Sequence, residues 1–272
     1  MKRMLKEELL RIFREYDFSP KKKLGQNFLI NEKVLSREVE YAKADGCEVL
    51  EIGAGTGFLT REFAKRAKKV IAVEKDKLLS KILRDLLSTY KNVEIIEGDF
   101  LDQNIDKAQV IFSNVPYRIS SHLTFKIAEM TFERALLCYQ KEFAQRMVAG
   151  PNTRDYSRLS VMSQLNFKID LLETVSKGSF YPVPEVDSAI VLLAQRRHKL
   201  DEFYKNVINL LFQHKRKSVR NALLDSSYYL RLDKNKIKEI CENIANKDKR
   251  VISLSREEIF EVASKLKEVM QR

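Results

Sequence analysis

Two short motifs carry residue types that could perform chemistry. The first is Glu51-Ile52-Gly53-Ala54-Gly55-Thr56-Gly57, and the second is Asn114-Val115-Pro116-Tyr117. The Asn114 side-chain oxygen and the Pro116 carbonyl are acceptors, and we expect the proline to leave that carbonyl without a local donor. Acceptors at both N–H bonds of a planar amine would orient it towards an electrophilic methyl group and stabilise the charge that develops on nitrogen. Together the motifs predict methyl transfer to a planar exocyclic amine, without a strong general base.

The glycine motif predicts a turn that brings the backbone close to a nucleotide-like ligand. It follows the apolar pair Val49-Leu50 and precedes a helical pattern over residues 58–64, so we expect a strand, a tight turn and a helix start. Glycines leave room for the ligand, and a helix N-terminus supplies free N–H groups. Phe58 stands where the dinucleotide-binding pattern requires a small residue, and the segment lacks the Lys-Ser/Thr pair of a P-loop. The expected ligand therefore has no pyrophosphate.

Three further strands are expected to end at the same edge of a sheet. They span residues 70–74, 93–100 and 108–113. Glu74 ends the first strand, 21 residues after Gly53, where an acid can accept hydrogen bonds from ribose hydroxyls. Asp99 and Phe100 end the second and suit the amino edge and the face of an adenine ring. Asn114 follows the third, so the sequence predicts an α/β Rossmann-like sheet with one ligand crevice at its carboxyl edge.

The chain resembles the KsgA/Dim family of small-subunit ribosomal RNA adenine N6,N6-dimethyltransferases. The resemblance rests on the two motifs above and runs nearly end to end. Its other segments are residues 22–29 (KKLGQNFL), 98–100 (GDF), 156–161 (YSRLSV), 180–188 (FYPVPEVDS) and 212–223 (FQHKRKSVRNAL). Val115 departs from the family, which usually has leucine or isoleucine there. We expect little effect, because removing one methylene from an apolar anchor costs about 1 kcal/mol.

The resemblance implies a class I S-adenosylmethionine methyltransferase domain, a set of site residues and a reaction. The implied cofactor-binding residues are Gln26, Asn27, Leu29, Gly53, Gly55, Glu74, Lys75, Asp99, Phe100 and Asn114. The implied catalytic residues are Asn114, Pro116, Tyr117 and Phe180, with the two aromatic rings stacking on opposite faces of a flipped-out adenine. S-adenosylmethionine would give methyl groups to N6 of two adjacent adenosines near the 3′ end of small-subunit (16S-type) rRNA, leaving S-adenosylhomocysteine. Each adenosine would be methylated twice during small-subunit biogenesis, and no metal is expected.

Three alternatives remain open from the sequence. A sister enzyme that methylates one adenine of large-subunit RNA and confers antibiotic resistance shares the core motifs. A DNA adenine-N6 methyltransferase shares the chemical logic, but usually has an acidic or proline-doubled motif and a larger DNA-reading domain. A ribosome-assembly factor could bind pre-ribosomal RNA without catalysis. The intact Asn114, Pro116, Tyr117 and Phe180 favour an active enzyme.

Charge favours a nucleic-acid partner, expected to be small-subunit rRNA within an assembling subunit. The 272 residues include 50 Lys and Arg against 38 Asp and Glu, giving a net charge of +12 and a pI near 9.4. Lys21, Lys22 and Lys23 form one basic run beside the cofactor segment, which is expected to contact RNA through Lys22 and Lys23. A second is a cluster expected on one helix, whose apolar face is Phe203, Val207, Leu210 and Leu211. The cluster comprises Lys215, Arg216, Lys217 and Arg220.

The sequence predicts three regions. Residues 1–31 form an amphipathic helix and a basic arm, residues 32–197 the methyltransferase domain, and residues 198–272 a helical RNA-binding domain. Later strands are expected at 134–140 and 188–193. A capping box at Ser255-Arg256-Glu257-Glu258 is expected to begin the last helix.

Cysteines and histidines indicate neither a disulfide framework nor a metal site. Cys47, Cys138 and Cys241 are isolated, and His122, His198 and His214 lack ligand spacing. The sequence shows no signal peptide and no long apolar segment. We therefore expect a cytoplasmic protein that binds no membrane, and its length favours a monomer.

Overall fold

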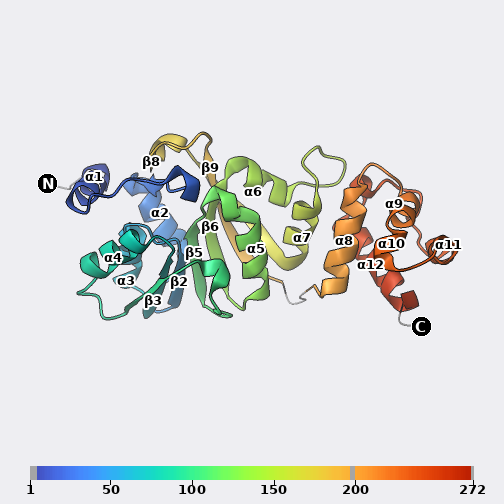
Figure 1. The fold of residues 1–272 in the computed structure, drawn as a ribbon, viewed down its shortest axis with the longest axis horizontal. Helices are drawn as coiled ribbons and strands as arrows, with labels where there is room; N and C mark the ends of the chain where they lie inside the picture. Colours follow the sequence, from blue (N-terminus) through green and yellow to red (C-terminus); the bar gives the residue numbers. More distant parts are fainter. Residues whose placement is uncertain (1–4, 197–199, 271–272) are drawn as a thin grey trace. The chain divides into compact units, whose positions relative to one another are not determined.

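The computed structural model describes residues 5–196 and 200–270, apart from the side chain of Lys22. The chain folds into two compact units (Figure 1). The first unit comprises Met1–Ala144 and Lys168–Gln195, and the second comprises Gln145–Phe167 and Arg196–Arg272. This division differs from the sequence-based boundary, because residues 145–167 group with the carboxyl-terminal helices. Within the second unit, the Tyr156 hydroxyl donates to the Leu254 carbonyl at 2.9 Å and its ring packs on Phe212.

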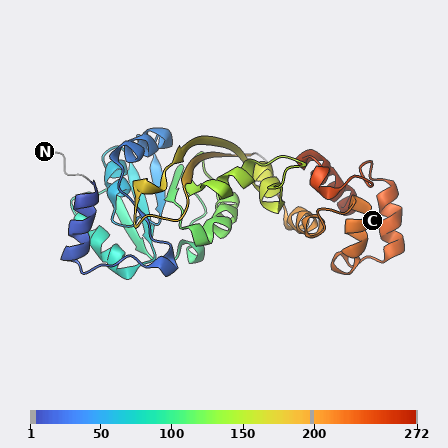
Figure 2. The same cartoon turned by 90° about the horizontal axis from the view of Figure 1, so that it is seen from above.

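The first unit is built on a sheet that has seven strands among the described residues. Their order across the sheet is β4-β3-β2-β5-β6-β9-β7. The strands are β2 (Glu48–Ile52), β3 (Lys69–Glu74), β4 (Val93–Glu97), β5 (Val110–Asn114), β6 (Arg134–Gln140), β7 (Phe167–Val175) and β9 (Ser188–Gln195). Strands β2 to β6 run parallel, and β9 runs antiparallel to β6. Helices lie on both sides of the sheet (Figure 2), which confirms the predicted α/β Rossmann-like fold.

Helices of the first unit alternate with its parallel strands. They are α2 (Glu32–Ala42), α3 (Phe58–Ala64), α4 (Lys77–Leu86) and α5 (Ser120–Glu129), and α6 (Lys141–Val148) follows β6. The side chains of Asn31 and Asp76 accept the first free N–H groups of α2 and α4, which fixes where these helices begin. Phe63 of α3 and Phe112 of β5 are buried with ring centroids 5.2 Å apart, so α3 packs on the sheet through an aromatic pair.

Four strands differ from the sequence prediction, among them the short β1 (Phe28–Leu29) and β8 (Phe180–Tyr181), which were not predicted. β4 ends at Glu97, so Asp99 and Phe100 do not belong to it. Instead the Asp99 side chain accepts from the Leu101 N–H at 2.9 Å and begins a 3-10 turn, η2 (Phe100–Asp102). Strand β7 was not predicted, because its apolar residues are interrupted by charged ones on an edge strand that is largely exposed.

The amino-terminal segment packs on the first unit as a helix and an arm. Helix α1 (Leu5–Glu15) buries Leu5, Leu9, Ile12 and Phe13, which agrees with the predicted amphipathic helix. The arm continues through a 3-10 turn, η1 (Lys22–Leu24), to β1 (Phe28–Leu29). Strand β1 pairs antiparallel with β8 (Phe180–Tyr181), which anchors the end of the arm.

The second unit is helical in its described part. Its helices are α7 (Arg158–Asn166), α8 (Glu202–Gln213), α9 (Val219–Asp225), α10 (Ser227–Leu230), α11 (Lys234–Glu242) and α12 (Arg256–Met270), with a 3-10 turn η5 (Val251–Ser253). The expectation that the four clustered cations share α8 was wrong, because α8 ends at Gln213. Lys215 and Lys217 lie in the following turn, and Arg220 lies in α9. Extended Ser218 interrupts the helix, and its side chain accepts from the Asn221 N–H.

We predict that replacing Ser255 by alanine lowers the free energy of unfolding of the second unit by about 1 kcal/mol. The predicted capping box is present, because the Glu258 N–H donates to the Ser255 hydroxyl at 3.1 Å and the Ser255 N–H donates to the Glu258 carboxylate at 2.9 Å. Urea denaturation followed by circular dichroism measures the effect. Ser253→Ala is the control, since its exposed hydroxyl donates only to the Arg250 carbonyl of its own turn. Equal midpoints for both variants would contradict the prediction.

Within residues 5–196 and 200–270, no helix is long and apolar enough to cross a membrane.

Candidate active site

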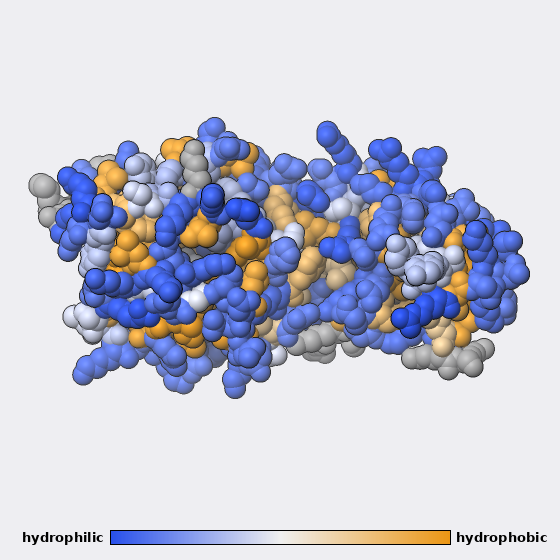
Figure 3. Space-filling model, in the orientation of Figure 1, coloured by the Kyte–Doolittle hydropathy of each residue, from blue (hydrophilic) through white to orange (hydrophobic). Residues whose placement is uncertain are grey.

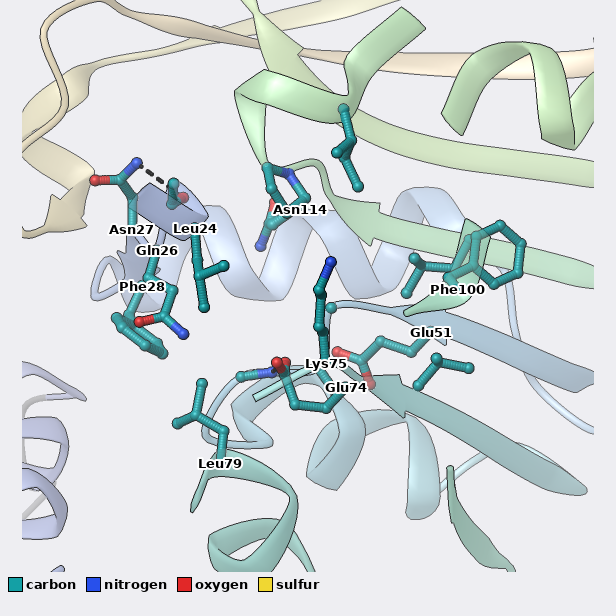
Figure 4. A pocket seen from close by; sticks show the side chains of 18 of the residues that line it. Leu24, Gln26, Asn27, Phe28, Glu51, Glu74, Lys75, Leu79, Phe100 and Asn114 are labelled. Atoms are coloured by element: carbon teal, nitrogen blue, oxygen red, sulfur yellow. Dashed lines mark hydrogen bonds between the residues drawn. The ribbon is translucent and has the colours of Figure 1, made fainter. Parts of the chain in front are cut away.

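A cavity of about 560 Å³ lies where the parallel strands of the first unit end (Figure 4). All ten residues expected to bind the cofactor line it: Gln26, Asn27, Leu29, Gly53, Gly55, Glu74, Lys75, Asp99, Phe100 and Asn114. Figure 4 shows the arm residues on one side of the cavity and Phe100 on the other, with Asn114 and Glu74 between them. The fold therefore brings together residues from distant segments, as the shared carboxyl edge predicted.

The glycine loop is fastened to the neighbouring strand by Glu74. The Glu74 carboxylate accepts from the Gly55 N–H at 2.9 Å and from the Asp76 N–H at 2.8 Å. Burial raises the pKa of Glu74, and these two amides act to lower it. Gly55 has φ +60°, and a Cβ there would lie 3.2 Å from the Phe28 ring, so only glycine fits without strain. The loop backbone is thus held open towards the cavity.

The arm is attached to the same region through Asp76. Lys21 Nζ lies 2.6 Å from the Asp76 carboxylate, whose side chain is 1% exposed. The Gln26 amide nitrogen donates to the same carboxylate at 3.3 Å, and its oxygen accepts from the Lys21 N–H at 2.7 Å. Asn27 donates to the Gly25 carbonyl at 3.3 Å, as Figure 4 shows. These contacts hold the arm as one wall of the cavity.

The opposite wall is the η2 turn. Lys75 Nζ lies 2.5 Å from the Asp99 carboxylate. Partial burial acts to raise the pKa of Asp99, but the Lys75 ion pair and the Leu101 amide lower it below its ordinary value. Lys126 Nζ donates to the carbonyls of Phe100, Leu101 and Gln103 at 2.7 Å each, and lies 4.8 Å from the Phe100 ring centroid. The carboxylate and the ring are therefore held in place.

Asn114 is the last residue of β5 and presents an unused acceptor. Its Oδ1 atom is buried and has no hydrogen-bond partner among the described residues. The Val115 N–H donates to the Cys138 carbonyl at 3.0 Å, which fixes the following turn to β6. The expectation that the Pro116 carbonyl lacks a local donor was wrong, because it accepts from the Ile119 N–H at 3.0 Å at the start of a 3-10 turn. A carbonyl has a second lone pair, so Pro116 keeps one acceptor site.

Neither of the two aromatic residues expected to stack on the substrate is fully exposed. Tyr117 is half-buried, and its hydroxyl lies 2.9 Å from that of Ser188. Phe180 is only 3% exposed, in the core beside β1. Asn114 and Pro116 belong to the cavity lining, whereas Tyr117 and Phe180 lie outside it. Stacking of a base on Phe180 therefore requires a local rearrangement, and both stacking roles stay predictions.

Three of the six cations expected to bind RNA have partners inside the protein. Lys215 Nζ donates to the Tyr156 carbonyl at 3.1 Å, Lys217 pairs with Asp225, and Arg220 pairs with Glu242. Lys23 lines the cavity and Arg216 is exposed, while the Lys22 side chain lies outside the described residues. Lys215 therefore has a structural contact that the sequence did not predict.

Sequence reasoning did not assign four polar residues of the cavity to the site. Glu51, Thr56, Arg118 and His122 also line it. Arg118 donates to the Lys23 carbonyl at 2.7 Å, which joins the Asn-Pro-Tyr motif to the arm. Its position directly after Tyr117 is the one signal that could have indicated it. His198 lies outside the described residues, and within the described part of the chain no three His, Cys, Asp or Glu residues are grouped to hold a metal ion.

Comparison with known proteins identifies the family. Residues 17–267 match the family described as "Ribosomal RNA adenine dimethylase". The chain belongs to this family. A relative from Thermococcus sibiricus, named "Probable ribosomal RNA small subunit methyltransferase A", is 46% identical over 253 residues, covering 91% of this chain and 92% of its own. A relative of the same name from Pyrococcus abyssi is 41% identical over 266 residues, covering 97% and 98%. The resemblance inferred from the motifs is thus confirmed.

Two solved structures show how the adenine dimethylase fold is shared. A dimethyladenosine transferase from Plasmodium falciparum has a TM-score of 0.80 at 29% identity, covering 89% of this chain and 98% of its own. The 23S rRNA methyltransferase ErmE has a TM-score of 0.65 at 30% identity, covering 88% and 99%. The chain is therefore an S-adenosylmethionine-dependent methyltransferase by family, and its class I fold is confirmed.

Two buried carboxyl groups lie beside the family's motifs. Glu38 of α2 is fully buried, and burial raises its pKa to about 8, although the Asn114 side chain acts to lower it. Glu51 of β2 is 2% exposed, and burial likewise raises its pKa to about 8, against the lowering effect of Thr60. Both groups therefore hold a proton at neutral pH.

We predict that replacing Glu38 by glutamine stabilises the first unit at pH 8 by about 4 kcal/mol. Between the ordinary pKa of 4.5 and the folded value of about 8, the unfolded chain releases this proton while the folded protein keeps it. Stability therefore falls as pH rises through this window, and glutamine removes that contribution. Urea unfolding at pH 5 and pH 8 measures it, with exposed Glu40→Gln on the same helix as the control. Parallel pH profiles for Glu38→Gln and the wild type would refute the prediction.

Proposed function

We propose that this chain transfers methyl groups from S-adenosylmethionine to N6 of two adjacent adenosines near the 3′ end of small-subunit rRNA. The product is N6,N6-dimethyladenosine, formed during assembly of the small ribosomal subunit. The observation that carries the proposal is the cavity, in which the glycine loop, Glu74, Asp99 and the unused acceptor of Asn114 share one edge of the sheet.

The cavity residues fit S-adenosylmethionine. The glycine loop allows close backbone approach, and Glu74 lies where a carboxylate can accept from ribose hydroxyls. Asp99 can accept from the adenine amino group, and Phe100 offers an apolar surface to its ring. The remaining assigned contacts come from Gln26, Asn27, Leu29, Gly53, Gly55, Lys75 and Asn114. When bound, this cofactor supplies an electrophilic methyl group on a sulfonium ion and leaves as S-adenosylhomocysteine.

The residues of the Asn-Pro-Tyr motif orient the target amine. The adenine N6 lone pair is delocalised into the ring, so the amine must be turned before it can attack. Asn114 Oδ1 and the second lone pair of the Pro116 carbonyl accept its two N–H bonds and direct its lone pair to the methyl carbon. As the N–C bond forms, the same dipoles stabilise the positive charge on nitrogen. The nitrogen then releases a proton to water, so neither a strong base nor a metal takes part. Tyr117 and Phe180 are proposed to stack on the base.

The named relatives favour small-subunit RNA over large-subunit RNA. Relatives that are 41–46% identical over nearly the whole chain carry the name "ribosomal RNA small subunit methyltransferase A". ErmE shares the fold at 30% identity with a lower TM-score than the dimethyladenosine transferase. Methylation of large-subunit RNA is therefore the second candidate, and a non-catalytic assembly factor is the third.

Partners follow from the substrate. We propose that the second unit is the RNA-binding region, with Arg216, Lys217 and Arg220 near phosphates and Lys22 and Lys23 contacting RNA beside the cavity. We propose a monomer, because one chain carries both the cavity and the basic helical unit. We also propose that it acts in the cytoplasm and binds no membrane.

The experiment that tests the function uses the purified chain, methyl-labelled S-adenosylmethionine and immature small ribosomal subunits. The RNA is digested and N6,N6-dimethyladenosine is detected by mass spectrometry. Dimethylation at adjacent adenosines supports the proposal. Label in large-subunit RNA would indicate the resistance-type enzyme, and binding without label would indicate an assembly factor.

A further inference from the structure

Two neighbouring tyrosines of the second unit are exposed far more than its other large hydrophobic side chains. Tyr228 is 85% exposed and Tyr229 is 69% exposed, both in the short helix α10. Their ring centroids lie 5.7 Å apart at 82°. Both flanks of the pair are fixed, because Ser226 and Leu230 are buried. The backbone that carries the two rings is therefore fixed, and the rings themselves contribute little to the core.

The surroundings of the pair are strongly basic. Residues 214–238 contain eight Lys or Arg and two Asp or Glu, so 25 of the 272 residues carry half of the net charge of +12. The charged residues of this segment are Lys215, Arg216, Lys217, Arg220, Asp225, Arg231, Asp233, Lys234, Lys236 and Lys238. Figure 3 shows pale side chains of intermediate hydropathy on the face where α10 lies, with hydrophilic and some hydrophobic side chains beside them. The aromatic pair thus lies within an excess of positive charge.

Several of these cations converge in space just before the pair. Lys217 Nζ lies 2.5 Å from the Asp225 carboxylate, and His214 Nδ1 lies 3.9 Å from the same oxygen. The hydrogen bond from Lys217, followed by the charges of Lys217, His214 and Lys234, lowers the pKa of Asp225. Lys217 and His214 therefore share the Asp225 carboxylate, and Arg220 and Lys236 are paired with Glu242 and Glu239. Among the described residues, Arg231 and Lys234 beside α10 have no carboxylate within 4 Å.

We propose that Tyr228 and Tyr229 form a stacking site for unpaired bases of RNA, with Arg231 and Lys234 contacting the flanking phosphates. Exposed aromatic faces and nearby cations are the combination that binds single-stranded RNA, because every base can stack while the phosphates require positive charge. A folded protein partner would instead need a broader apolar surface around the tyrosines. The site is separate from the cavity of the first unit, and it extends the proposed function by assigning a contact for the RNA.

The test measures binding of the full chain to two fluorescein-labelled RNAs, a single strand and a duplex of about 12 nucleotides each. Tyr228→Ala/Tyr229→Ala is expected to weaken single-strand binding at least about tenfold and duplex binding less than about twofold. Tyr228→Phe/Tyr229→Phe keeps the rings and is expected to bind like the wild type. The salt dependence should stay unchanged in the alanine variant and become shallower in Arg231→Gln/Lys234→Gln.

Wild-type binding by the alanine variant, or an equal loss on duplex and single strand, overturns the proposal. A loss only on ribosomal subunits, with free RNA bound normally, also overturns it and indicates a ribosomal protein as the partner. The assay needs no methyl transfer, so a failed methylation assay leaves this result intact. Because both side chains are exposed, circular dichroism of the variants should match the wild type.

Discussion

Replacing Asn114 by alanine is expected to slow methyl transfer by about 10²–10³-fold, with little change in RNA binding. The Asn114 Oδ1 atom has no hydrogen-bond partner among the described residues, although the Asn114 side chain also acts on the buried Glu38 carboxyl. We expect Oδ1 to accept from the amine. The following turn is held by the backbone bond from Val115 to Cys138, so the substitution removes the acceptor and leaves the turn in place. The loss therefore falls on the chemical step.

Single-turnover methylation at saturating cofactor measures this loss, and electrophoretic mobility shift measures RNA binding. Asn206→Ala, an exposed asparagine in α8, is the control and should react like the wild type. A variant that binds RNA and does not methylate it separates catalysis from an assembly role. An Asn114→Ala enzyme as fast as the wild type would exclude Asn114 from the mechanism.

Replacing Glu74 by alanine is expected to weaken cofactor binding by about 10–100-fold. Two effects add, because the substitution removes the proposed acceptor for the ribose and releases the N–H groups of Gly55 and Asp76. The freed glycine loop must then be ordered again when the ligand binds.

Isothermal titration calorimetry with S-adenosylhomocysteine measures the affinity. Glu97→Ala is a matched control, since Glu97 lies beside Glu74 in the register of β3 and β4 but is exposed and pairs with Arg84. Its affinity should match the wild type. Equal affinities for the Glu74 and Glu97 variants would show that Glu74 does not hold the ligand.

Local motifs predicted one part of the cavity well, because Glu74 and Asn114 sit at the ends of parallel strands, whereas Gln26, Asn27 and Leu29 come from the arm. The strand at residues 134–140 matches β6, and Glu74 ends β3 as expected, while β5 extends one residue beyond the predicted strand to include Asn114. Parallel strands place their carboxyl ends at one edge of the sheet, regardless of the length or conformation of the loops between them. The sequence pattern was therefore sufficient to gather the cofactor residues at the strand ends.

Features that depend on tertiary packing were not predictable in this way. The burial of Phe180 results from the pairing of β8 with β1, which lie about 150 residues apart in the sequence. Ser218 divides what the apolar periodicity indicated as one basic helix, because capping outweighs continuation there. The Pro116 carbonyl accepts a hydrogen bond from the Ile119 N–H because a 3-10 turn begins there, and the motif alone does not predict that turn. None of these three features could be predicted without knowing the path of the backbone in the folded protein.

The attachment of the arm at Asp76 has a kinetic consequence. Residues 23–29 line the cavity, and the Lys21 and Gln26 contacts to Asp76 hold them there. An enzyme that adds several methyl groups to one substrate must release S-adenosylhomocysteine and bind a new S-adenosylmethionine between additions. If RNA leaves more slowly than the arm opens, all methyl groups are added in one encounter, and if it leaves faster, partly methylated RNA is released. The lifetime of the Lys21–Asp76 contact would then set the processivity of the enzyme.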